Sequence, residues 1–154
     1  MSKNSRKQVT LYSDGSSLGN PGPGGYGGIL EYQGKTKEYS GGEPETTNNR
    51  MELRGVIEGL KLLKEPCDVT VVSDSSYVVN AINRWLQGWV AKEFKKVKNV
   101  DLWKEYLKVS TPHSVKGVWV KGHSGHAKNE RCDKLAVIEA EKQKAMLSNI
   151  KEQR

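Results

Sequence analysis

The chain has 154 residues, with 25 Lys and Arg against 18 Asp and Glu, so its net charge at neutral pH is +7. Its apolar runs are too short for a membrane-spanning helix or a secretion signal, which excludes a membrane protein and a secreted precursor. A chain of this length forms one domain that needs no disulfide or structural metal. Two cysteines within regular segments, without ligand spacing, favour a cytoplasmic protein. Nothing in the sequence indicates a dimer, and we expect a monomer.

The positive charge is clustered. Residues 84–98 hold five basic residues and one acidic residue, and the first seven residues add three more basic ones. Aromatic side chains interleave with the cations, a combination that binds nucleic acid by neutralising phosphates and stacking on sugars or bases. A solvated helix face is the alternative. The residues concerned are Arg84, Trp85, Trp89, Lys92, Phe94, Lys95, Lys96 and Lys98.

The first third of the chain predicts three antiparallel strands. Ten of the 16 glycines lie between Gly15 and Gly42, which indicates strands and tight turns. Alternation over 9–14 predicts a strand that stops at Gly15 and leaves Asp14 at its end. Two further strands, at about 26–32 and 35–40, form a hairpin through Gln33-Gly34. The three strands make a meander.

The rest of the chain alternates helices with strands. Apolar spacing predicts a helix from about 49 to before Pro66, a buried strand at 69–74 and a second helix at about 78–86. A basic protrusion, about 84–98, precedes a third helix at about 102–107, a strand at 115–120 and a last helix. The order βββαβααβα predicts an α/β fold with a mixed five-stranded sheet flanked by helices. We assign 1–7 to a basic N-terminal extension, 8–145 to the domain and 146–154 to a polar C-terminal tail.

Four carboxylates occupy positions where this layout can bring them together. Asp14 and Asp74 end strands, Glu52 lies in the first turn of the first helix, and Asp133 lies near the start of the last. Ligands bind beyond the carboxyl ends of strands in such sheets. Converging carboxylates need a cation, and oxygen ligands without cysteine favour Mg²⁺ or Mn²⁺.

Each of these acids also has a simple structural interpretation. Asp14 fits a turn, and Glu52 stands in capping-box spacing from Asn49. Asp74 fits a helix N-cap, and Asp133 fits an exposed helix surface. Only their joint placement favours a site.

The loop of residues 121–126 carries two histidines between glycines. A histidine beside carboxylates can move protons near neutral pH, which makes His123 a candidate for this role. His126 is closer to the last helix and fits an ordinary N-terminal helix residue.

Several long blocks resemble the type 1 ribonuclease H family of the bacterial kind. They cover about residues 8–142 in order, and each is too long for a chance match. The blocks are Asp14-Gly15-Ser16 with 19–27, Thr46-Thr47-Asn48-Asn49-Arg50-Met51-Glu52-Leu53, Ser73-Asp74-Ser75, 119–126 and Asn129-Glu130-Arg131-Cys132-Asp133. The resemblance implies a ribonuclease H-like fold and an endonuclease that hydrolyses the RNA strand of RNA–DNA hybrids, leaving a 3′-hydroxyl and a 5′-phosphate.

The resemblance also implies roles for single residues. Asp14, Glu52, Asp74 and Asp133 match the carboxylates that bind two Mg²⁺ ions, for which Mn²⁺ can substitute. His123 matches a histidine that assists proton transfer or product release. The contacts to the hybrid match Gly15, Asn20, Thr47, Asn48 and Asn49, and Trp85, Trp89, Lys92, Lys95 and Lys96 match the family's basic protrusion.

Two positions depart from the family pattern. Ser76 stands where a glutamine is usual, and the protrusion is several residues shorter. We expect Ser76 to change substrate affinity or strand selectivity. We expect the shorter protrusion still to bind the hybrid, with Trp89 against a DNA sugar or phosphate. Two other functions fit the charge and the acids: a non-catalytic module that binds hybrids, and another two-metal nuclease or transferase of the same fold.

Overall fold

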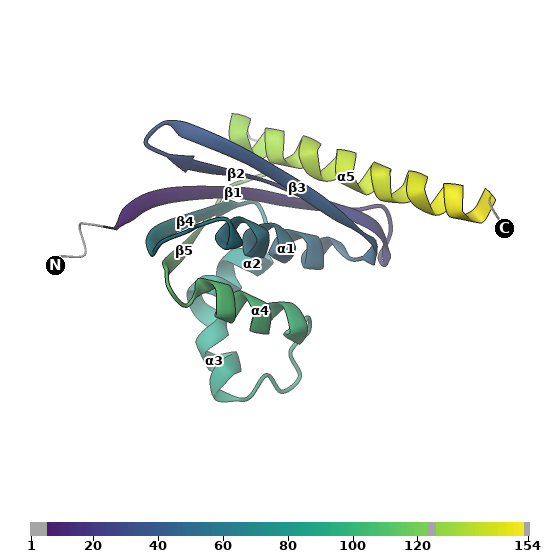
Figure 1. The fold of residues 1–154 in the computed structure, drawn as a ribbon. Helices are drawn as coiled ribbons and strands as arrows, with labels where there is room; N and C mark the ends of the chain where they lie inside the picture. The colour runs from purple at the N-terminus through teal and green to yellow at the C-terminus, as the bar shows by residue number, and fades with distance from the viewer. Residues whose placement is uncertain (1–5, 123–125, 153–154) are drawn as a thin grey trace.

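The computed structural model describes residues 6–122 and 126–152. Five strands form one sheet in the order β3-β2-β1-β4-β5, with α5 on one face and α1 and α4 on the other (Figure 1). The strands are β1 (Lys7–Ser17), β2 (Gly22–Tyr32), β3 (Lys35–Thr46), β4 (Cys67–Ser73) and β5 (Ser114–Trp119). β1 to β3 pair antiparallel, whereas β4 runs parallel to both β1 and β5. The mixed sheet predicted from the sequence is confirmed.

The helices follow the predicted order. They are α1 (Asn48–Lys61), α2 (Ser76–Asn80), α3 (Leu86–Ala91), α4 (Val100–Ser110) and α5 (Ala127–Glu152). A π-helical turn, η2 (Ala81–Trp85), joins α2 to α3. The second helix predicted from the sequence is therefore a continuous helical segment with π-helical geometry in its middle. α5 continues through residue 152, because its sequence contains no glycine or proline, and residues 146–152 therefore extend this helix. None of the described helices is sufficiently long and apolar to span a membrane.

The main hydrophobic core lies between the sheet and α1. Leu11 of β1 and Val71 of β4 are fully buried and face the apolar stripe of α1, which includes Leu53 and Ile57. Trp103 of α4 is fully buried and belongs to the same core. The burial of these side chains orients α1, and α1 in turn carries Glu52 and the asparagines that precede it.

The three antiparallel strands are longer than the sequence predicts, and β2 is lengthened through its glycines. Gly24 to Gly28 pair with both neighbouring strands, although their composition is typical of turns. A Cβ at Gly25 would lie 2.4 Å from the carbonyl oxygen of Ala136, and one at Gly27 would lie 2.6 Å from that of Cys132. The glycines are needed because α5 lies directly on the strand.

We predict that Gly27→Ala destabilises the protein by about 1–3 kcal/mol, because the added methyl group must push α5 away from β2. Urea denaturation measures the change. Gly88→Ala is the matched control: nothing lies within 4 Å of its added Cβ, and alanine raises helix propensity in α3. An unchanged stability in Gly27→Ala would contradict the close seating of α5.

Candidate active site

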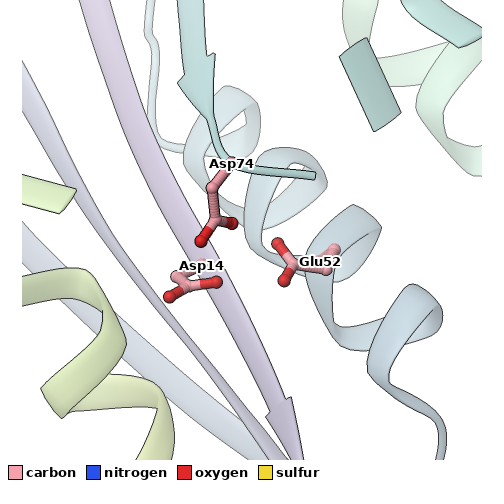
Figure 2. Close-up of side chains that lie close together, drawn as sticks. All are labelled: Asp14, Glu52 and Asp74. Atoms are coloured by element: carbon pink, nitrogen blue, oxygen red, sulfur yellow. The ribbon is translucent and has the colours of Figure 1, made fainter. Parts of the chain in front are cut away.

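Three carboxylates meet at the carboxyl end of β4. Asp14, Glu52 and Asp74 each offer an oxygen, and these oxygens lie within 4.8 Å of one another. Figure 2 shows the three side chains pointing toward a common centre from β1, α1 and the residue after β4. Asp14 is 7% exposed and Glu52 is 4% exposed. Such a cluster of buried oxygens is suited to a hard divalent cation.

The end of the parallel pairing creates the space for this cluster. β1 and β4 are paired as far as Tyr12 and Val72, and Asp14 and Asp74 each follow two residues later. The sequence predicted that the first strand ends at Asp14. Instead β1 continues to Ser17, because it remains paired with β2 on its other side. Asp14 therefore stands where β1 has lost its parallel partner but is still held rigidly.

Gly15 brings the third carboxylate within reach. A Cβ at Gly15 would lie 2.3 Å from the backbone nitrogen of Glu52, so the backbone of α1 touches β1 at this point. The Gly15 N–H also donates to Oδ1 of Asp14 at 2.9 Å. Its close contact with α1 gives Gly15 a steric role that sequence analysis, which placed it among the substrate contacts, did not foresee.

The simple structural interpretations of three acids are wrong. The N-cap of α1 is Thr47, whose hydroxyl accepts from the Arg50 N–H at 3.3 Å, so Glu52 caps nothing. The N-cap of α2 is Ser75, which accepts from the Val78 N–H. Asp14 lies within a paired strand and in no turn.

Two residues that sequence analysis gave no role lie against Asp74. The indole Nε1 of Trp119 donates to the backbone oxygen of Asp74 at 3.0 Å and holds it. A Cβ at Gly122 would lie 2.9 Å from Oδ2 of Asp74, so the loop after β5 passes close to this carboxylate. Both residues lie in the block that resembles ribonuclease H, which is the one signal that could have marked them.

Asp133 stands beside the three carboxylates on a different element. It is half-buried on α5 and lines one cleft with Asp14 and Asp74, together with Lys121, His126 and Asn129. The interpretation of Asp133 as an exposed surface charge is therefore wrong. His123 lies outside the described residues.

The carboxylates are destabilised by their surroundings. Burial raises the pKa of Asp14 to about 7, and the charges of Asp74 and Asp133 act in the same direction. Burial, followed by the charge of Asp14, holds the pKa of Glu52 well above its usual range. The buried Oε2 of Glu52 has no hydrogen-bond partner among the described residues. A bound divalent cation would offset the cost of ionising these carboxyls and would give the unpaired oxygen a partner.

The predicted substrate residues line grooves beside the carboxylates. Asn20, Thr47, Asn48 and Asn49 line one groove, which Lys98 and Asn99 complete. Asn48 and Asn49 also line a second groove that contains Ser76, Glu52 and Asp74. The two asparagines at the start of α1 thus connect the first groove to the carboxylates.

The basic protrusion uses part of its aromatic surface internally. Trp89 is half-buried, with its ring centroid 5.5 Å from that of Trp103, while Trp85 is 43% exposed. Lys92, Lys95 and Lys96 are exposed around the turn after α3. In Figure 1, α3 and this turn extend away from the sheet, on the side of α1 and α4.

Comparison with known protein families matches residues 6–141 to RNase H. The chain belongs to the ribonuclease H family. Ribonuclease H from Sulfurovum sp. (strain NBC37-1) is 75% identical over 96% of this chain and 100% of its own length. The structure of LC9-RNase H1, a type 1 RNase H with the type 2 active-site motif, matches with a TM-score of 0.82 and 36% identity, over 90% of this chain and 74% of LC9-RNase H1. LC11-RNase H1, solved in complex with an RNA/DNA hybrid, matches with a TM-score of 0.63 and 28% identity, over 87% of this chain and 97% of LC11-RNase H1.

The resemblance to bacterial type 1 ribonuclease H is therefore confirmed. The protein is a hydrolase that acts on RNA–DNA hybrids, and the ribonuclease H family depends on divalent metal. A non-catalytic binding module is not favoured, because the acidic cluster that could hold the metal is present.

We predict that the metal-free ribonuclease H loses stability as pH rises from about 4 through 7. The pKa of Asp14 is raised in the folded state, so folding opposes its ionisation, and that cost is absent below the unfolded pKa. The Asp14→Asn variant removes that cost. In EDTA it should equal wild type near pH 4 and be about 4 kcal/mol more stable at pH 8, measured by urea denaturation. Glu45→Gln, an exposed carboxyl, is the control and should follow wild type. Equal stability of wild type and Asp14→Asn at pH 8 would contradict the strained cluster.

Proposed function

We propose that this ribonuclease H cleaves the RNA strand of hybrids internally, leaving a 3′-hydroxyl and a 5′-phosphate, with two Mg²⁺ ions held by Asp14, Glu52, Asp74 and Asp133. The observation that supports this best is the buried cluster with its unpaired Glu52 Oε2. Both Asp14 and Glu52 have raised pKa values, so they become good ligands when a cation offsets their burial and mutual repulsion. Mn²⁺ has the same preference for oxygen and should substitute.

Each residue of the site has a defined task in this proposal. When bound, the ions activate the attacking water and neutralise charge on the scissile phosphate. Asp14 and Glu52 stand on β1 and α1, and the backbone of Asp74, directly after β4, is held by the Trp119 indole, so the three side chains supply a rigid set of oxygens. Asp133 completes the set from α5. His123, which lies outside the described residues, assists proton transfer or product release.

The grooves beside the carboxylates are suited to recognising a hybrid. Asn48 and Asn49 lie between the first groove and the carboxylates, where neutral amides can read the 2′-hydroxyls across a shallow minor groove. The Thr47 hydroxyl accepts from Arg50 N–H and keeps its own proton to donate to a DNA phosphate, together with Asn20. The Gly15 backbone and the short side chain of Ser76 contribute the remaining contacts.

The basic protrusion supplies attraction that does not depend on sequence. Its exposed cations Lys92, Lys95 and Lys96 contact phosphates, and Trp85 offers the more accessible ring. Trp89 contacts a DNA sugar or phosphate with the part of its surface that Trp103 leaves open. We further propose that the enzyme acts as a monomer in the cytoplasm.

We predict that wild type cuts end-labelled RNA–DNA hybrid in Mg²⁺ and leaves RNA–RNA and DNA–DNA duplexes intact. EDTA or Asp14→Asn should lower cleavage at least about 10³-fold, because a ligand of the cation is lost. Gel analysis of the products measures the cut and its ends. Tight hybrid binding without cleavage would favour a binding module, and cleavage of DNA duplexes would favour another two-metal nuclease of this fold.

We predict that alanine at Lys92, Lys95 and Lys96 together raises KM for the hybrid and flattens its dependence on salt. The slope of log KM against log salt should fall by about 3, because each of the three lost phosphate contacts removes about one unit. Alanine at the exposed Lys35, Lys37 and Lys144 makes the same change in net charge elsewhere and is the control. A slope that changes equally in both variants would show that the protrusion makes no specific contact.

A further inference from the structure

One side chain ties α5 to the strand that ends at the carboxylates. The amide Nδ2 of Asn129 donates to the backbone oxygen of Val72 at 3.3 Å, across 57 residues of sequence. Val72 is paired with Tyr12, and the two residues precede Asp74 and Asp14 by two positions each. This hydrogen bond, here called the tether, therefore binds the sheet two residues before each of the two aspartates.

The same tether lies one helical turn from the fourth carboxylate. Asn129 and Asp133 are separated by four residues on α5, so they share a face of the helix, and both line the cleft with Asp14 and Asp74. The close contacts that seat α5 elsewhere involve Gly25 and Gly27 of β2, which meet the backbone of residues 132 to 140. Asn129 adds a contact to β4 in the first turn of the helix, just before these residues.

The second polar atom of the amide is unused by the described residues. Because Nδ2 is directed at a carbonyl, the acceptor Oδ1 is the atom left over, and it is buried without a hydrogen-bond partner in the described part of the chain. Packing alone would favour an apolar side chain at this position, since a buried unpaired acceptor costs about 1–3 kcal/mol. An amide here therefore indicates a polar role in the cleft.

We infer that Asn129 is a positioning residue, which sets the distance from Asp133 to Asp14 and Asp74 by holding the first turns of α5 against Val72. This inference rests on the proposed function, because it gives the distance a purpose in binding divalent cations. Loss of the tether lets Asp133 move away with the helix, while the cluster of Asp14, Glu52 and Asp74 stays in place. The expected effect of such an indirect contact is about tenfold on cation affinity or turnover.

The test uses Asn129→Ala, Asp133→Asn, the double variant and, as a control on the same helix, Val137→Ala, which trims a partly exposed side chain. Mn²⁺ binding to the free protein is measured by calorimetry, and kcat and KM for the hybrid are measured separately. Asn129→Ala should weaken Mn²⁺ binding and lower kcat, each about tenfold, with KM unchanged. In the Asp133→Asn background it should change neither value, because the residue it positions is already disabled.

Asn129→Leu separates the tether from mere bulk. It keeps a neutral side chain of similar size but removes the donor to Val72, so it should lose Mn²⁺ affinity and kcat as Asn129→Ala does. Wild-type values in Asn129→Ala or Asn129→Leu, or losses that multiply in the double variant, would overturn the inference. The proposed function fails separately, if wild type does not cut hybrid or Asp133→Asn cuts as wild type does.

Discussion

The burial of neighbouring carboxylates is the constraint on which the rest of this structure depends. Asp14 and Glu52 are almost fully buried beside Asp74, and this burial, together with the charges of the neighbouring carboxylates, raises the pKa of both groups. Without a cation such carboxylates repel one another, so the surrounding backbone must hold them in place. Two glycines leave room for this arrangement: a Cβ at Gly15 would meet the backbone of Glu52, and one at Gly122 would meet Oδ2 of Asp74.

The position of α1 is fixed from both sides. Its apolar stripe packs on β1 and β4, while its outer face is tied to neighbouring elements by ion pairs. Arg54 lies 3.4 Å from Glu43 of β3 and 2.9 Å from Glu105 of α4, and Arg50 makes a two-pronged contact with Asp101. Partly exposed pairs of this kind add little stability singly, but here they connect β3 and α4 to the helix that carries Glu52.

Substrate recognition and chemistry share this one helix. Its N-terminus lies in the groove that we propose for the hybrid, and Glu52 follows Asn49 by less than one turn. The N-terminus of a helix favours anions, since its first N–H groups lack partners within the helix. A phosphate held there stands at a set distance from the carboxylates, because no hinge lies between Asn49 and Glu52. Helix α5 carries Asp133 from the other face of the sheet, and Asn129 ties its first turn to β4, the strand that precedes Asp74.

The order of strands and helices, the mixed sheet and the four candidate acids follow from the sequence, because periodicity, glycines and acidic residues act locally. The resemblance to the family then indicated that these acids form one site. Their spacing alone could not show this, because they lie tens of residues apart in the sequence. Only the tertiary structure decided that Thr47 and Ser75 are the caps, that β1 continues past Asp14, and that Trp89 turns toward Trp103. These features depend on which distant backbones touch, and such contacts arise when the whole chain packs rather than within any one segment.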